Sequence, residues 1–138
     1  RSGIPYAVTQ GFSPRIKAAY CPALPGCVLS LSHTEGAALL ALSDAPVGAD
    51  IERVRPIPPR LGRDFPGTEE TFWRRWTAAE AAAKREGRGA GALLPLGRRG
   101  FPEGPEARRL ALRSGFAAAL AGAGEFTIRT VTAEELME

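Results

Sequence analysis

The chain has 138 residues, a length typical of one domain with its own hydrophobic core. Eighteen Lys and Arg residues against 15 Asp and Glu residues give a formal charge of +3, which suits an acidic or phosphate-rich partner but is far from the dense basic stripe of a nucleic-acid-binding protein. Two cysteines and one histidine are too few for a disulfide framework or a Cys/His zinc site, and no apolar run approaches the ~18 residues of a membrane span.

These features predict a protein of a reducing compartment, and since no signal peptide opens the chain we expect it to be cytoplasmic. We expect a single domain over residues 1–138. The chain starts at Arg1 without Met, which suggests a fragment or a domain cut from something longer. Residues 1–26 are expected to be loop-rich because prolines and glycines recur there. In this segment Arg15 and Lys17 are either solvated loop cations or phosphate contacts.

A short strand is predicted at 27–32, where apolar and polar residues partly alternate. It runs into the sequence SHTEG at 32–36. Small hydroxyls, one histidine and a glycine at the end of a strand suit a phosphate cradle, because hydroxyls donate hydrogen bonds and glycine lets backbone N–H groups turn inward. A lone histidine is more often structural than functional, so both interpretations stay open.

The next segments are expected to form a second strand pair. Residues 37–42 predict a buried strand or a short helix, and 43–46 a turn. The sequence VGADIE at 47–52 predicts another strand. Strand, turn and strand suggest an antiparallel hairpin that brings residue 33 and residue 50 into one neighbourhood.

The strand at 47–52 is the most informative segment. Side chains at i and i+2 share one face of a strand, so Asp50 and Glu52 would project together while Ile51 points into the core. Two carboxylates roughly 6–7 Å apart repel each other unless a cation lies between them. Mg²⁺ prefers such oxygens and usually keeps several waters. The alternative is a surface strand with two solvated acids.

A helix is expected to begin near Thr68 and to end at the glycines of 87–89. Within it, Thr77 and Glu80 have the spacing of a capping box, which would give Glu80 a structural role. Lys84 follows Glu80 by one turn. The two residues therefore form either an exposed ion pair, or a third carboxylate for the cation with a catalytic lysine, Lys84, beside it that binds phosphate or stabilises a developing charge.

The remaining segments carry weaker signals. Residues 53–67 predict an irregular, Arg-bearing connection, and 91–104 a loop. Alanine and leucine over 106–122 favour one helix by propensity, but Gly115 argues for a break. Residues 125–131 alternate apolar with polar side chains and are the clearest predicted strand.

Three of these segments together resemble the 4′-phosphopantetheinyl transferases, in their long, pseudo-dimeric branch. They are SHTEG at 32–36, VGADIERVRP at 47–56 and FWRRWTAAEAAAKREGRG at 72–89. Each segment alone is a weak signal, but the three occur in the family's order and at nearly its spacings. The resemblance covers roughly residues 14–131.

The resemblance implies an enzyme that moves the phosphopantetheine arm of coenzyme A onto a serine of an acidic acyl or peptidyl carrier protein and releases 3′,5′-ADP. It implies a Mg²⁺ ion held by Asp50, Glu52 and Glu80. It also implies that Glu80 acts as the general base toward the carrier serine, directly or through water. The carrier proteins and the pathway, whether fatty acid, polyketide or nonribosomal peptide synthesis, stay open.

The same resemblance implies contacts to the phosphates of coenzyme A. Lys84 matches the family's phosphate-binding lysine, and Ser32 and His33 match its pyrophosphate-binding pair. Arg15 or Lys17 lies near the family's Gly-Lys-Pro or Gly-Arg-Pro element. That match is loose, because this chain has the sequence PRIK there.

Two departures from the family pattern stand out. The family usually has Lys just before the helix glutamate, where this chain has Ala79, so one cation is missing from the phosphate cradle. Only about thirty residues precede the Ser-His motif, where the long branch has a full extra half. Either the piece is truncated, a second chain supplies the surface in a homo-oligomer, or this is a domain of a multidomain synthase. Three arginines are candidates to replace the missing lysine: Arg74, Arg75 and Arg85.

The resemblance also favours strands near 109–113 and 116–121, with a turn at 114–115, in preference to one helix. The expected fold is α+β, a small antiparallel sheet with the helical stretch at 68–87 packed on one face. A degenerate module that binds coenzyme A or a carrier protein with little turnover is the alternative function. An unrelated metal-dependent phosphohydrolase is disfavoured by the Ser-His motif and the helix residues.

Overall fold

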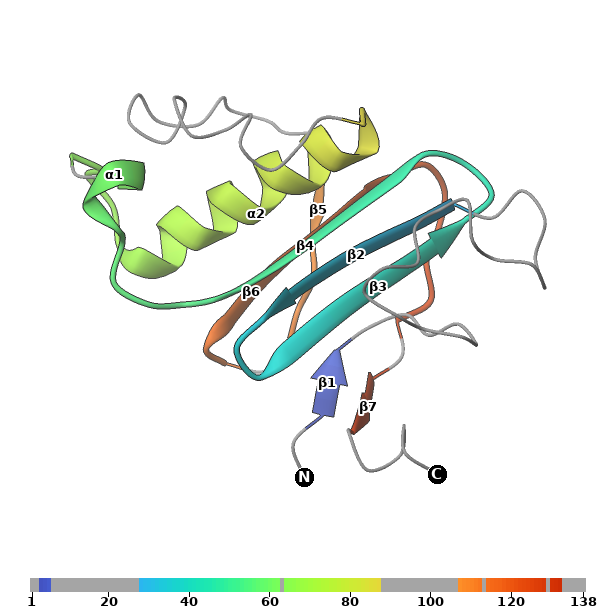
Figure 1. Ribbon diagram of the computed structural model, residues 1–138, viewed down its shortest axis with the longest axis horizontal. Helices are drawn as coiled ribbons and strands as arrows, with labels where there is room; N and C mark the ends of the chain where they lie inside the picture. The colour runs from blue at the N-terminus through green and yellow to red at the C-terminus, as the bar shows by residue number, and fades with distance from the viewer. Residues whose placement is uncertain are drawn as a thin grey trace.

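The structure is α+β, with small antiparallel sheets and one long helix (Figure 1). The computed structural model describes residues 3–5, 28–62, 64–87, 107–112, 114–128 and 130–132. The strands are β1 (Gly3–Pro5), β2 (Val28–Thr34), β3 (Ala37–Ser43), β4 (Val47–Arg53), β5 (Arg108–Arg109), β6 (Phe116–Gly122) and β7 (Thr130–Thr132). The helices are the single turn α1 (Pro59–Gly62) and α2 (Glu69–Arg85).

The strands form three antiparallel sheets, with the orders β2-β3, β4-β6-β5 and β1-β7. Strands β2 and β3 make a hairpin whose tight turn contains Gly36, at φ +85°, a conformation that L side chains rarely adopt. The expected hairpin between 37–42 and 47–52 is wrong, because β4 pairs with β6, with Asp50 opposite Ala119. The short link after β3 therefore carries the chain from one sheet to the next.

Strand β2 lies beside β4 and joins it through side chains. Three alternate hydroxyls on β2 each accept a hydrogen bond from a backbone N–H of β4: Ser30 from Ala49 at 2.9 Å, Ser32 from Ile51 at 3.0 Å and Thr34 from Arg53 at 3.2 Å. The residue numbers of the paired residues increase together along β2 and β4, so the two strands run in the same direction. We call this row the hydroxyl seam. It brings residues 33 and 50 together, as expected, although by another route than a hairpin.

Strands β4 and β6 are buried on both faces. On one face Val47, Ala49 and Ile51 of β4 join Ala118 and Leu120 of β6 in a core that also includes β3. The other face lies under α2, where the small residues of β6 leave room for a helix. The β6 residues packed with α2 are Ala117, Ala119 and Ala121.

Helix α2 begins and ends where the sequence predicts. Thr68 is the N-cap and its hydroxyl accepts a hydrogen bond from the N–H of Thr71, and Gly87, at φ +80°, follows the last turn. The capping box predicted at Thr77 and Glu80 is wrong, since both residues lie in the middle of this helix. The Thr77 hydroxyl instead donates to the carbonyl of Trp73 at 2.9 Å.

The backbone of α2 makes its closest approach to the sheet at Gly48. A Cβ atom added there would lie 1.9 Å from the carbonyl oxygen of Ala81 and 2.6 Å from the backbone N of Arg85. Both are backbone atoms, so no rotamer change relieves the clash. Further along, Phe72, Trp73 and Trp76 of α2 pack edge-on or stacked against one another over Ala117.

The C-terminal part of the described chain confirms one expectation and corrects another. The turn at Ser114 and Gly115 and the strand β6 after it confirm the preference for strands over one helix at 106–122, although β5 is limited to Arg108–Arg109. The strand predicted at 125–131 is wrong over residues 125–128, which lie in no strand, whereas Thr130 and Val131 belong to β7 (Thr130–Thr132). Its partner is β1, which lies in the segment expected to be a loop. Both edges of β6 are already taken by β4 and β5, so residues 125–128 have no free edge there.

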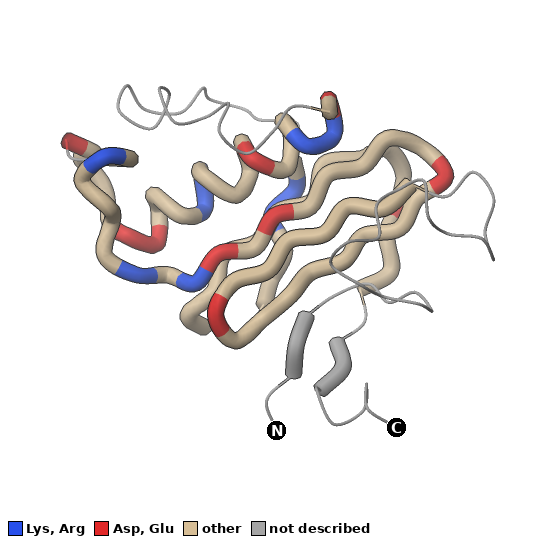
Figure 2. The backbone as a smooth tube through the Cα atoms, viewed as in Figure 1, with Lys and Arg blue, Asp and Glu red and all other residues tan. Residues whose placement is uncertain are grey.

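Within the described residues, no helix combines the length and the apolar character that crossing a membrane requires. Most of the charged residues that the structure describes lie on β4, on α2 and in the connection between them, with others in the turns and on β5, whereas β2 and β3 carry no Lys, Arg, Asp or Glu along their length (Figure 2). Charged residues are therefore concentrated in the region of β4 and α2.

Replacing Gly48 by alanine tests the close approach of α2. We expect Gly48→Ala to lower the free energy of unfolding by about 2 kcal/mol or more, because overpacking against backbone forces the helix to shift. The control is Gly124→Ala, where a Cβ meets nothing within 4 Å and only the positive φ of +84° is strained, at about 1 kcal/mol. Urea denaturation measures both. A Gly48→Ala loss no larger than that of the control would contradict the packing described here.

Candidate functional site

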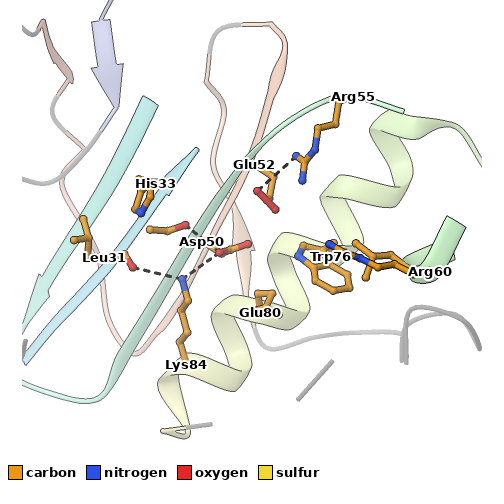
Figure 3. A pocket seen from close by; sticks show the side chains of 11 residues that line it. Leu31, His33, Asp50, Glu52, Arg55, Arg60, Trp76, Glu80 and Lys84 are labelled. Atoms are coloured by element: carbon orange, nitrogen blue, oxygen red, sulfur yellow. Dashed lines mark hydrogen bonds and ion pairs between the residues drawn. The ribbon is translucent and has the colours of Figure 1, made fainter. Parts of the chain in front are cut away.

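A cavity of about 500 Å³ lies between β2, β4 and the helices, and charged side chains converge on it (Figure 3). Its volume is within the range of roughly 300–1,000 Å³ typical of small-molecule sites. The cavity draws on three segments that are far apart in the sequence. Its lining is Leu31, Ser32, His33, Asp50, Glu52, Arg55, Arg60, Leu61, Trp76, Glu80 and Lys84.

Asp50 projects from β4 toward α2 and is 6% exposed. Its Oδ1 accepts hydrogen bonds from the Ser32 hydroxyl at 3.0 Å and from Lys84 Nζ at 3.1 Å. Its Oδ2 is buried without a hydrogen-bond partner among the described residues. The alternative of two solvated acids on a surface strand is therefore wrong for Asp50. A buried carboxylate oxygen without a donor is costly, and a ligand or cation would relieve that cost.

Lys84 reaches from α2 across to the strands. Besides its ion pair with Asp50, its Nζ donates to the carbonyl of Ala49 at 3.0 Å and to that of Leu31 at 3.5 Å. An ammonium has three donors, so these contacts account for all of them. The exposed ion pair between Lys84 and Glu80 is not formed. Lys84 instead ties α2 to β4 beside the carboxylate of Asp50.

Glu80 is buried and is 3% exposed. Its Oε1 has no hydrogen-bond partner within the described part of the chain. Burial raises the pKa of the Glu80 carboxyl to about 7, and the nearby charges of Asp50 and Glu52 add to the increase while Lys84 opposes it. The uncharged form of Glu80 is therefore favoured more than that of an ordinary, solvent-exposed glutamate.

The other two carboxyls of the cavity are also harder to ionise than usual. Burial raises the pKa of Asp50 to about 6, although Lys84 and the Ser32 hydroxyl lower it. Burial also raises the pKa of Glu52, against the effect of Arg55, whose Nη1 lies 3.6 Å from the Glu52 carboxylate. Three carboxyls that disfavour each other's charge in one cavity are a setting in which a divalent cation would be stabilising.

The residues fit a divalent cation only in part. No three His, Cys, Asp or Glu side chains of the described residues are gathered as a ready-made metal centre. Asp50 and Glu80, each with one carboxylate oxygen that has no hydrogen-bond partner among the described residues, nevertheless both line the same cavity. Mg²⁺ is commonly held by one or two carboxylates together with waters and substrate phosphates. Asp50 and Glu80 fit that pattern, and a third ligand from Glu52 stays a prediction.

The remaining predicted site residues are placed differently. The Ser32 hydroxyl is occupied between Asp50 and the N–H of Ile51, so it orients the carboxylate in this structure. His33 is exposed and lines the cavity. Arg15 and Lys17 lie outside the described residues. Arg74, Arg75 and Arg85, considered as replacements for a lysine at Ala79, are not among the cavity-lining residues.

The sequence analysis missed two arginines of the lining, Arg55 and Arg60. Arg55 had a usable signal, because it follows Glu52 by three residues with a proline after it, where the chain leaves β4. Arg60 lies on the single turn α1, inside a connection expected to be irregular. Trp76 closes the same side of the cavity (Figure 3).

Comparison with models of known protein families and with curated proteins finds no match to this chain.

The stability of the protein without divalent cations is expected to fall as the pH rises from about 4 to 7. Asp50 and Glu80 have higher pKa values in the folded protein than the ordinary 3.8 and 4.5, so the folded state binds more protons than the unfolded chain across this interval. Glu80→Gln should remove the contribution of Glu80 to this loss of unfolding free energy, which is on the order of 1–3 kcal/mol across the interval. Urea denaturation at a series of pH values measures this. The same pH dependence of the unfolding free energy in the wild-type protein and in Glu80→Gln would contradict the burial of a titrating Glu80.

The hydroxyl seam offers a matched pair of variants. Ser30→Ala and Ser32→Ala each leave a buried backbone N–H without an acceptor, which should cost about 1–3 kcal/mol. Only Ser32→Ala also removes a donor to Asp50, so only this variant should raise the pKa of Asp50 further. Carbon-detected NMR titration of the Asp50 carboxyl measures the pKa. Equal pKa values in the two variants would show that Ser32 does not orient the carboxylate.

Proposed function

We propose that this chain transfers the 4′-phosphopantetheine arm of coenzyme A to a serine of an acyl or peptidyl carrier protein, in a Mg²⁺-dependent reaction that releases 3′,5′-ADP. The observation that carries the proposal is the convergence of three separate motifs on one cavity. Ser32 and His33 come from β2, Asp50 and Glu52 from β4, and Glu80 and Lys84 from α2. We also propose that the α+β fold is that of the phosphopantetheinyl transferases.

The reaction requires one bond to form and one to break at phosphorus. The serine oxygen of the carrier protein bonds to the phosphorus that bears the pantetheine arm. The bond from that phosphorus to the bridging oxygen of the pyrophosphate breaks, and 3′,5′-ADP leaves with the electron pair. Bound Mg²⁺ would supply Lewis-acid stabilisation of the pyrophosphate, held by Asp50 and Glu80 with Glu52 nearby.

Glu80 is the residue best suited to take the serine proton. A general base must lie within hydrogen-bond reach of the proton that it takes, and Glu80 lines the cavity on which the three motifs converge. Its Oε1 has no hydrogen-bond partner among the described residues, so this oxygen keeps an unused acceptor. Lys84 holds Asp50 in place, and its positive charge favours the ionised forms of Asp50 and Glu80.

A module that binds coenzyme A with little turnover is the second candidate. It is favoured by Ala79, which leaves the position before Glu80 without a cation, and by the absence of a ready-made three-ligand metal centre in the described part of the chain. The two candidates share the cavity and differ in chemistry. A binder would keep its affinity for coenzyme A and leave carrier proteins unmodified.

A mass measurement on carrier proteins tests the proposal. The protein is mixed with coenzyme A, Mg²⁺ and a panel of apo carrier proteins, and each carrier is weighed. We expect a gain of one phosphopantetheine group on at least one carrier, and we expect EDTA to block it. Calorimetric binding of coenzyme A without any gain in carrier mass would favour the binding module.

The same assay assigns roles to the carboxylates. Asp50→Asn and Glu80→Gln keep the side-chain shape, and each should lower the initial rate at least 100-fold, as expected for loss of a cation ligand or a general base. Asp44→Asn, in the exposed turn before β4, is the control and should keep the wild-type rate. Rates within threefold of wild type for both cavity variants would contradict the proposed mechanism.

A further inference from the structure

We infer that Arg55 is an anion-binding residue of this cavity and holds a phosphate group of the pyrophosphate-containing substrate, exchanging its contact with Glu52 for that phosphate. The inference rests on the proposed function and deepens it, because it names a residue that the motif resemblance does not assign. It also supplies a cation for a phosphate cradle that lacks one at Ala79.

The guanidinium of Arg55 lies over a buried aromatic ring. Its central carbon lies 3.8 Å from the centroid of the Trp73 ring, and the Trp73 Nε1–H donates to the carbonyl of Arg55 at 2.9 Å. Trp73 is fully buried between Phe72 and Trp76. The side chain and the backbone of Arg55 are thus fixed by the same indole, which pre-organises the guanidinium before any ligand binds.

The hydrogen bonds of Arg55 leave much of its donor capacity for a ligand. Nη1 donates to the carbonyl of Arg53 at 2.8 Å and lies 3.6 Å from the Glu52 carboxylate. Within the described residues both polar contacts are made by this one nitrogen. A guanidinium has five N–H donors in a planar fork, so Nη2 and Nε remain to bind a phosphate in bidentate fashion.

The contact with Glu52 is suited to exchange. At 3.6 Å it is longer than a hydrogen bond, and the Arg55 side chain is 40% exposed, so breaking the ion pair costs little. Figure 3 shows Arg55 on the opposite side of the cavity from Lys84, with Glu52 beside it. A phosphate held by Arg55 would leave the carboxylate of Glu52 free to turn toward a cation.

Lys84 is less suited to be the main phosphate contact in this geometry. Its three donors are engaged by Asp50 and by two backbone carbonyls. A phosphate would have to displace a buried ion pair to reach this ammonium, and leaving Asp50 uncompensated is expensive. Arg55 reaches the same cavity with N–H donors that no described residue engages.

Calorimetry with inorganic pyrophosphate tests the inference at one fixed, saturating Mg²⁺ concentration. Arg55→Lys keeps the charge and the alkyl stem but loses the planar fork, and we expect it to weaken binding at least tenfold. The control is Arg53→Lys, since Arg53 pairs with exposed Glu35 at 3.0 Å and is not among the cavity-lining residues. This control should bind within twofold of wild type. Unchanged thermal melting of Arg55→Lys would show that the fold is kept.

A second measurement reports on Arg55 itself. In an ¹⁵N NMR spectrum the Nε–H signal of Arg55 should shift on adding pyrophosphate, and the signal of Arg53 should not. Pyrophosphate affinity of Arg55→Lys within twofold of wild type, or no pyrophosphate binding by the wild-type protein, would overturn the inference.

The outcomes also separate this inference from the proposed function. If pyrophosphate binding depends on Arg55 but no carrier protein gains mass, the anion site is supported and the transferase proposal fails. If carriers gain mass and Arg55→Lys has the wild-type KM for coenzyme A and the wild-type pyrophosphate affinity, the transferase proposal is supported and the role of Arg55 is rejected.

Discussion

Helix α2 reaches strand β4 at a position where β4 has no side chain, Gly48. A methyl group there would lie 1.9 Å from the Ala81 carbonyl oxygen, so the spacing of the helix and the sheet depends on this glycine. Because the spacing is short, Glu80 and Lys84 on the helix face Asp50 on the strand within one cavity. The alanines of β6 continue the same shallow surface under the helix. The close packing of the two backbones thus brings the residues of the site together.

The electrostatic character of the cavity follows from that packing. Burial between helix and sheet makes three carboxyls harder to ionise, and Lys84 compensates for only one of them directly. The result is a site in which Asp50 and Glu80 each keep a carboxylate oxygen that no described residue contacts by a hydrogen bond, and at one side of which Arg55 lies over the ring of Trp73. Excess negative charge within, and a fixed guanidinium beside it, suit a ligand that combines a cation with phosphates.

Much of this arrangement is encoded locally and was predictable from the sequence. The strand with Asp50 and Glu52, and the helix that follows Thr68, each have a period and end signals that neighbouring residues determine. The partner of β4 was not predictable, because strand pairing depends on residues of β6 about seventy positions away. Residues 125–131 alternate like a strand, but alternation does not create a free sheet edge. Arg55 was missed because the indole that fixes it lies 18 residues further along the chain.

Anomalous diffraction from crystals grown with coenzyme A and Mn²⁺ in place of Mg²⁺ would show whether the cation and the phosphates bind together beside Asp50 and Glu80. We expect one strong manganese peak within about 2–2.5 Å of the carboxylates of Asp50 and Glu80, with the pyrophosphate of coenzyme A bound to the same ion. Manganese peaks only at exposed acids of the surface, or coenzyme A bound away from this cavity, would contradict this expectation.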